Sequence, residues 1–256
     1  MASFRRPVER SSASAYIPTP GPLDRFSPLV DGSMQGTESR HTDNLLTGTT
    51  TIAAVCKDGV VLGTERRATA GTLIANKQTQ KVFKIDDNLG LTIAGLVGDA
   101  QTLVRYLRAE VSLYRLRRSA PLGVEGAATL LANILSGNRM FPYYAWLLMG
   151  GVDSKGGHVF SIDPAGGSIE DRFVSVGSGS PFAYGILEEG YSRDMSVSDG
   201  VDLALRGLTV AMKRDSASGD GYLINTITSK EYREFSEDEI NKRLKALKIP
   251  LPPALP

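Results

Sequence analysis

Gly48-Thr49-Thr50-Thr51-Ile52 marks the point where the character of this sequence changes and its fold begins. A polar leader with five of the thirteen prolines precedes it, and a β-branched run typical of a strand follows it. The segments 50–57 and 60–64 flank Lys57-Asp58-Gly59, a turn sequence that predicts a β-hairpin. We therefore expect the folded domain to open with an antiparallel hairpin.

The rest of the chain divides around this point. Residues 1–48 are rich in Ser, Thr and Pro and have no long apolar period, which is typical of a flexible leader. Residues 49–248 are expected to form one domain. Residues 249–256 hold four prolines and predict an irregular C-terminal tail, because proline cannot continue a helix.

Within the domain, blocks of strands alternate with pairs of helices. Strands are predicted at 50–57, 60–64, 81–85, 91–97, 144–152, 158–162, 172–176 and 222–228, and helices from Asp99 onward and at 124–135, 182–191, 198–214 and 237–247. This order predicts an α+β fold: a four-layer αββα sandwich of two packed antiparallel β-sheets, with helices on both outer faces.

Composition excludes several classes of function. Lys and Arg number 29 against 28 Asp and Glu, so a formal net charge of +1 favours neither nucleic acid nor a membrane as partner. The single cysteine, Cys56, excludes an intramolecular disulfide and fits a reducing cytoplasm.

The two histidines are His41, in the leader, and His158, at the start of a predicted strand. A Ser-His-Asp apparatus or a histidine-rich metal site is therefore poorly supported.

Thr49 offers a different kind of base. If the Gly48–Thr49 bond is cut, Thr49 gains a free α-amine beside its own hydroxyl. An α-amine has a reference pKa of about 7.7–8.0, so nucleophile and base can share one residue. Taken alone this signal is weak, and the stretch is more typical of an ordinary strand start.

Five short motifs support the catalytic interpretation by their order and separation. They are Gly48-Thr49-Thr50-Thr51, Thr64-Glu65-Arg66-Arg67-Ala68-Thr69, Thr92-Ile93-Ala94-Gly95-Leu96-Val97-Gly98-Asp99-Ala100, Gly177-Ser178-Gly179-Ser180-Pro181 and Arg214-Asp215-Ser216-Ala217-Ser218-Gly219-Asp220. In this arrangement the chain resembles the proteasome β subunits of archaeal type, which are N-terminal-nucleophile threonine hydrolases.

The resemblance implies a role for each matching residue. Autocatalytic cleavage between Gly48 and Thr49 would remove residues 1–48 as a propeptide and expose Thr49 as the nucleophile. Lys81 would lie beside the Thr49 hydroxyl, where an ammonium favours deprotonation, and Glu65 would hold Lys81. Outside the resemblance, Glu65 is typical of a solvated carboxylate in a charged loop, and Lys81 of a lysine at a strand edge whose ammonium reaches solvent.

The remaining catalytic residues follow from the same resemblance. Asp215, Ser218 and Ser178 would support the Thr49 amine, and the Gly95 N–H would stabilise the oxyanion. Without the resemblance, residues 215–220 are typical of an ordinary turn between a helix and a strand, and Gly95 of the end of a strand.

The resemblance also implies a pocket for the substrate residue before the cut bond. Its expected lining residues are Ala68, Thr69, Thr79, Phe83, Ile93 and Val97. They are uncharged and mostly apolar, which favours cleavage after hydrophobic residues. The Thr69 and Gly95 backbones would pair with an extended substrate.

For partners, the resemblance implies α subunits and other β subunits in a four-ring α7β7β7α7 barrel, a regulatory unfolding ATPase and polypeptide substrates. It implies no nucleic acid, no membrane, no cofactor and no metal, and a cytoplasmic location. Two alternatives stay open: a non-catalytic ring subunit of the same family, and an amidohydrolase acting on a small molecule.

Overall fold

The computed structural model describes residues 48–252. The predicted leader up to residue 47 and the last four residues of the predicted tail lie outside the described residues. Residues 249–252 carry neither helix nor strand. Among the described residues, no helix combines the length and the apolar character that a membrane crossing requires.

Two five-stranded antiparallel sheets form the centre of the molecule. The first sheet has the order β10 (Phe173–Val176), β1 (Thr51–Cys56), β2 (Gly59–Glu65), β11 (Tyr222–Thr228) and β12 (Tyr232–Glu234). The second sheet has the order β5 (Val82–Asp86), β6 (Leu89–Gly95), β7 (Ala145–Asp153), β8 (Gly156–Ile162) and β9 (Ser168–Asp171). A separate two-stranded sheet pairs β3 (Ala68–Ala70) with β4 (Leu73–Asn76).

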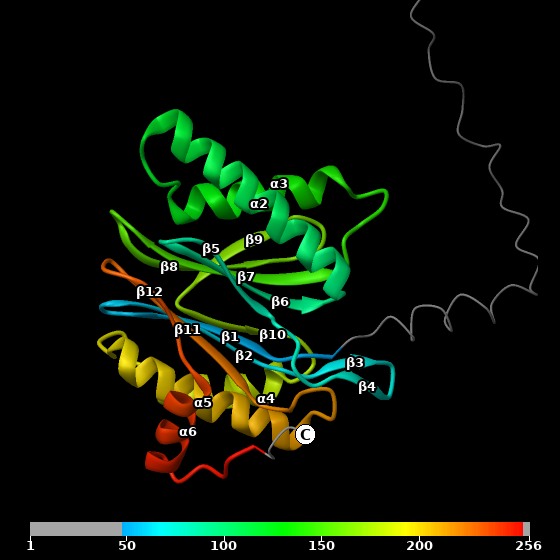
Figure 1. Cartoon of the computed structure of the whole chain (residues 1–256), viewed down its shortest axis with the longest axis vertical. Coiled ribbons are helices and arrows are strands. Elements are labelled where there is room, and N and C mark those ends of the chain that lie inside the picture. Colours follow the sequence, from blue (N-terminus) through cyan, green and yellow to red (C-terminus); the bar gives the residue numbers. More distant parts are fainter. Residues whose placement is uncertain (1–47, 253–256) are drawn as a thin grey trace, which may run out of the picture.

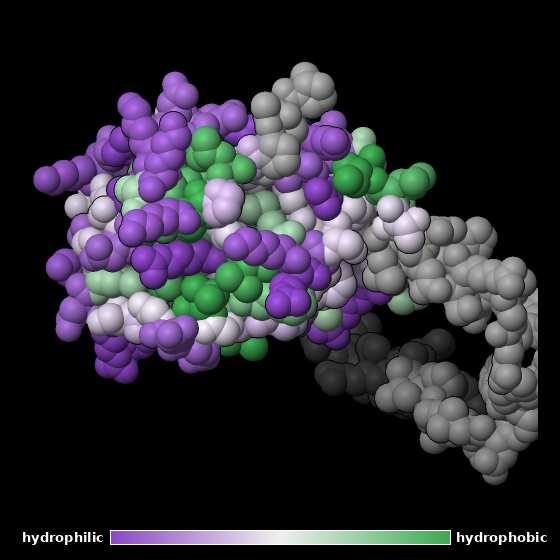
Figure 2. All heavy atoms as spheres, turned by 90° about the horizontal axis from the view of Figure 1, so that it is seen from below, coloured by the Kyte–Doolittle hydropathy of each residue, from purple (hydrophilic) through white to green (hydrophobic). Residues whose placement is uncertain are grey.

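Helices cover the outer face of each large sheet (Figure 1). The second sheet is covered by α2 (Val97–Arg118) and α3 (Val124–Gly137). The first is covered by α4 (Ser180–Gly190), α5 (Val197–Arg214) and α6 (Glu237–Ala246), whose outer face is hydrophilic with hydrophobic groups between (Figure 2). The four-layer αββα sandwich predicted from the sequence is therefore confirmed.

The predicted opening hairpin is also confirmed. Strands β1 and β2 pair from Thr51↔Thr64 to Cys56↔Gly59, so Lys57 and Asp58 form the turn. This register brings the residues just before β1 next to the end of β2.

The start of α2 differs from the prediction. The sequence favoured a strand up to Val97 and a helix from Asp99, whereas β6 ends at Gly95 and α2 begins at Val97. Asp99 does not cap the helix, because its Oδ2 accepts a hydrogen bond from the Tyr144 N–H at 2.8 Å. Val97 consequently approaches the pocket from a helix and not from a strand.

Four short strands were not predicted. They are β3, β4, β9 and β12, of three or four residues each. All four residues of β4 and of β9 are exposed, so neither strand carries the alternation of apolar and polar residues that marks a half-buried strand.

The space between the two sheets is filled by a layer of buried apolar side chains. Its members are Ala53, Val60, Leu62, Val82, Leu148, Val159, Val174 and Ile227. Leu62 is fully buried and lies against Gly90 and Gly150 of the opposite sheet, where a Cβ atom would come within 3 Å of its side chain.

Leu62→Ala should therefore leave a cavity between the sheets and lower the free energy of unfolding by roughly 2–5 kcal/mol. Leu73→Ala is the matched control, since Leu73 is 71% exposed on β4 and should change stability little. Urea unfolding of both variants measures the difference. Equal stability of the two variants would contradict the packing described above.

Candidate active site

Thr49 lies at the point where the β1–β2 register brings the start of the domain next to Glu65. Glu65 is the last residue of β2, and its side chain is fully buried. The Thr49 hydroxyl donates a hydrogen bond to Glu65 Oε1 at 2.9 Å. A threonine hydroxyl and a carboxylate thus meet inside the protein, away from bulk water.

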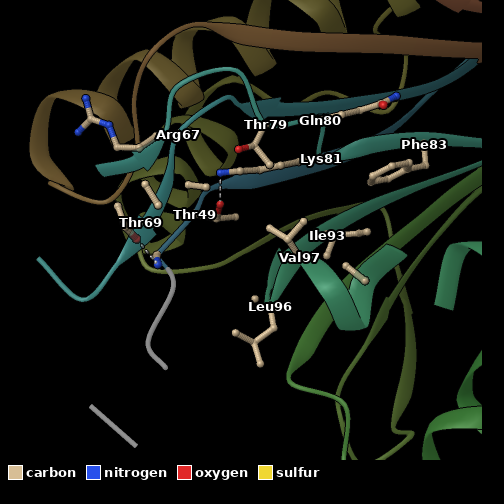
Figure 3. Close-up of a pocket in the computed structure, with 15 residues that line it drawn as sticks. Thr49, Arg67, Thr69, Thr79, Gln80, Lys81, Phe83, Ile93, Leu96 and Val97 are labelled. Carbon is tan, nitrogen blue, oxygen red and sulfur yellow. Dashed lines mark hydrogen bonds between the residues drawn. The ribbon is translucent and has the colours of Figure 1, made fainter. Parts of the chain in front are cut away.

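Lys81 completes this contact from the other sheet. It directly precedes β5, and its Nζ donates a hydrogen bond to Thr49 Oγ1 (Figure 3) and another to Glu65 Oε1. Burial lowers the pKa of Lys81 from its ordinary value, against the opposing attraction of Glu65. The hydroxyl therefore faces an ammonium that gives up its proton more readily than a solvated lysine does.

Backbone groups satisfy the rest of the Glu65 carboxylate. Its Oε2 accepts from the N–H of Arg67 at 2.6 Å and from the N–H of Gly219 at 3.0 Å, and its Oε1 accepts from the N–H of Thr50 at 3.3 Å. Hydrogen bonds to a charged group contribute about 1.5–3 kcal/mol each. Together they offset the cost of burying the charge and fix the carboxylate in one orientation.

A second polar chain begins at the Thr49 nitrogen. In this unprocessed chain the nitrogen is a peptide amide, and its N–H donates to Ser178 Oγ at 3.1 Å. Ser178 donates in turn to Asp215 Oδ2 at 2.6 Å. Ser218 donates to the same oxygen at 2.6 Å and contacts Thr50 Oγ1 at 2.7 Å.

This arrangement refines the predicted support of the Thr49 amine. Asp215, at the C-cap of α5, reaches the Thr49 nitrogen through Ser178 and not directly. Ser218 contacts Thr50 and Asp215, so its connection to Thr49 is indirect. Because an ionised carboxylate only accepts, both serines point their protons at Asp215, which leaves Ser178 Oγ free to accept from Thr49.

A cavity of about 250 Å³ opens beside these groups. All six residues predicted for the pocket line it, namely Ala68, Thr69, Thr79, Phe83, Ile93 and Val97. Gly95 also lines it, with a φ of +130°, and a Cβ there would overlap the Tyr144 carbonyl oxygen. A glycine is therefore required where the backbone of β6 turns along the cavity.

Sequence reasoning missed several residues of the site. Ala75, Gln80, Leu96 and Ala100 also line the cavity, and Ala75 belongs to the unpredicted β4. Arg67 also lines the cavity, and its guanidinium points away from Thr49 (Figure 3). The guanidinium donates to Asp220 Oδ2 at 2.7 Å and to the Ser216 carbonyl at 2.7 Å. The charge of Arg67 is thereby matched outside the apolar part of the cavity.

Two other candidate centres do not take part. Cys56 is buried away from the cavity, and burial raises the pKa of its thiol to about 12. His158 Nδ1 lies 2.6 Å from Glu170 on β9, as expected for a structural histidine. Within residues 48–252, no group of three or more His, Cys, Asp or Glu side chains is placed to hold a metal ion.

Comparison with known proteins agrees with this geometry. The family model described as "Proteasome subunit" matches residues 45–227. A "Proteasome subunit beta" from Methanothermobacter thermautotrophicus is 53% identical over 80% of this chain and 98% of its own length. Proteins of the same description from Ferroglobus placidus and Thermoplasma acidophilum are each 50% identical, over 80% and 79% of this chain and 99% and 96% of their own lengths.

The chain belongs to the proteasome subunit family, and the relatives that it matches are β subunits. The family predicted from the sequence is thus confirmed. Membership makes the chain a hydrolase of peptide bonds.

If the chain cleaves itself before Thr49, as the resemblance implies, the buried Lys81 predicts an unusual pH dependence of that cleavage. Because burial lowers its pKa, Lys81 should lose its proton below the value of about 10.4 of a solvated lysine. The precursor has no Thr49 amine, so its self-cleavage rate should fall as pH rises through the lowered pKa of Lys81. Intact mass against time at a series of pH values measures that rate.

Lys81→Arg keeps the positive charge without titrating in this range, so the alkaline fall should disappear even if the rate is lower. Lys84→Arg is the control, because Lys84 is 43% exposed and pairs with Asp87. A wild-type rate that continues to rise above pH 10 would show that neutral Lys81 is the active form.

Proposed function

We propose that the chain is a threonine endopeptidase whose nucleophile is the Thr49 hydroxyl. The observation that carries this proposal is the contact of Thr49 Oγ1 with the buried Glu65–Lys81 pair at the edge of an apolar cavity. A hydroxyl is a weak nucleophile at its ordinary pKa and needs an adjacent group to activate it. Lys81 stabilises the alkoxide, and Glu65 holds Lys81 in place.

The first reaction of the site is on its own chain. Thr49 Oγ1 attacks the Gly48 carbonyl carbon and passes its proton to the Glu65 carboxylate, to which it donates a hydrogen bond, while Lys81 stays charged. The bond from that carbon to the Thr49 nitrogen then breaks, the nitrogen takes up a proton, and an ester remains. Water hydrolyses the ester, which releases residues 1–48 as a carboxylic acid and leaves Thr49 with a free amine.

The second reaction repeats this chemistry on a polypeptide. The Thr49 amine now serves as base for its own hydroxyl, oriented by Ser178, with Asp215 and Ser218 behind it. The Gly95 N–H donates to the developing oxyanion, a contribution of about 2.7–4 kcal/mol to lowering the barrier. An acyl-ester forms, the new N-terminus leaves, and water regenerates the hydroxyl.

The cavity lining supports a preference for cleavage after hydrophobic residues. Phe83, Ile93 and Val97 face it from the second sheet and α2, and no unmatched charge lines its apolar part (Figure 3). A charged substrate side chain would lose its hydration there without gaining a partner. The Thr69 and Gly95 backbones hold the substrate as an added strand.

We further propose that the subunit acts in the cytoplasm within an α7β7β7α7 barrel, fed by an unfolding ATPase through the α rings. The support is family membership and the apolar side chains exposed on the outer helices, such as Tyr106, Leu113 and Leu116 of α2.

A non-catalytic ring subunit would not need Thr49, Glu65 and Lys81 together. The apolar cavity likewise disfavours a small polar substrate.

Thr49→Ala should abolish both leader removal and peptidase activity, because it removes the attacking oxygen. Thr49→Ser keeps a hydroxyl and should retain part of both activities. Intact mass and hydrolysis of a peptide ending in a hydrophobic residue measure the two effects. Thr102→Ala on α2 is the matched control, since the Thr102 hydroxyl bonds within its own helix. Substantial activity in Thr49→Ala would exclude Thr49 as nucleophile.

Assembly should control the first reaction. The isolated chain should remain largely unprocessed, and mixing with α-type rings should start both cleavage and peptidase activity. Size-exclusion chromatography with an activity assay on each fraction measures this. The Thr49→Ala chain serves as control, because it should assemble in the same mixture and keep its leader. Full activity eluting at monomer mass would refute the barrel.

A further inference from the structure

We propose that the Thr69 side-chain hydroxyl is a positioning residue for leader removal, because it holds the last leader residue through its backbone N–H. The inference rests on the proposed self-cleavage at Gly48–Thr49 and goes beyond it by assigning what orients the bond to be cut. The Gly48 N–H donates to Thr69 Oγ1 at 3.0 Å (Figure 3). Thr69 is 6% exposed, so little water competes for this hydrogen bond.

The local backbone aims the Thr69 hydroxyl at Gly48. Strand β3 pairs with β4 as Ala68↔Asn76 and then Thr69↔Ile74, so Ala75 is an extra residue in the ladder. Such a bulge bends the strand and redirects side chains, and bulges are over-represented next to active sites. The β3–β4 hairpin belongs to neither large sheet, and it carries Thr69 to the point where the leader enters.

The other side of Gly48 is closed by two loops of the first sheet. A Cβ atom on Gly48 would overlap Ala217 Cβ and lie 2.7 Å from Ser178 Oγ. No side chain can therefore anchor this residue. Its carbonyl must stay accessible to the Thr49 hydroxyl, so the N–H is the group through which the protein can orient the residue.

The hydroxyl and the backbone of Thr69 then serve different reactions. An extended substrate is proposed to pair with backbone groups of Thr69, whereas the leader uses the side chain. Losing the hydroxyl should consequently slow the first reaction more than the second. This difference separates positioning of the leader from a general effect on the pocket.

Thr69→Val in the full chain, assembled with α-type rings, removes the acceptor with little change in shape. We expect self-cleavage to slow by roughly two- to tenfold, the range for the loss of one neutral hydrogen bond. The kcat for peptide hydrolysis should fall by less. Thr69→Ser keeps the acceptor and should process at close to the wild-type rate. Intact mass against time gives the processing rate, and kcat is normalised to free Thr49 N-termini.

Two outcomes would overturn the proposal. Thr69→Val could remove its leader at the wild-type rate, or it could lower the rate of leader removal and kcat by the same factor. If Thr69→Val does not assemble, Thr69→Ala is measured against Thr69→Ser by the same two rates. Failure of the proposed function would look different. In that case Thr49→Ala would still lose its leader, whatever residue stands at position 69.

Discussion

The buried ion pair between Glu65 and Lys81 is the contact on which the site depends. Glu65 ends β2 of the first sheet and Lys81 directly precedes β5 of the second, so the pair joins the two sheets at the ends of these strands. Burying two charges costs several kcal/mol per ion unless every hydrogen-bonding position is filled. Backbone N–H groups and the Thr49 hydroxyl fill those of Glu65. The Thr49 hydroxyl thus completes a network that would otherwise be costly to bury.

The hydrogen bonds around the Thr49 nitrogen are fixed in the same way, by the limited donors and acceptors of its neighbours. Asp215 can only accept, so it sets the direction of the hydrogen bonds from Ser178 and Ser218. In the unprocessed chain the Ser178 oxygen receives the one amide proton of Thr49. After cleavage the same oxygen would face an amine with a lone pair and more than one proton. Ser178 is therefore already placed at the Thr49 nitrogen before the bond is cut, which is consistent with the proposal that one site performs both reactions.

The sequence predicted the large elements because they leave local signals, whereas the candidate site residues were predicted through the order and separation of five motifs that resemble a known family. The Lys57-Asp58-Gly59 turn and the β-branched run after Gly48 predict the first hairpin without reference to distant residues. The wall of the pocket left no such signal. Strand β4 is exposed along its length, so its apolar residues follow no buried period, and Ala75 gave no indication that it lines a cavity. The path from Asp215 to Thr49 through Ser178 depends on rotamers of residues 37 positions apart, which spacing alone does not determine.

The exposed β3–β4 hairpin also explains how one cavity can serve two kinds of chain. A hairpin that pairs with neither large sheet contributes little to the core, so its shape is free to follow the needs of the site. Its bulge places Thr69 at the leader and Ala75 in the cavity wall, on neighbouring paired strands. The two large sheets hold Glu65 and Lys81, whose positions must be fixed closely because the attraction between two charges falls with distance. The β3–β4 hairpin supplies groups that contact a peptide. A small displacement of the hairpin would cost one hydrogen bond, whereas a displacement of Glu65 or Lys81 would leave a buried charge unpaired.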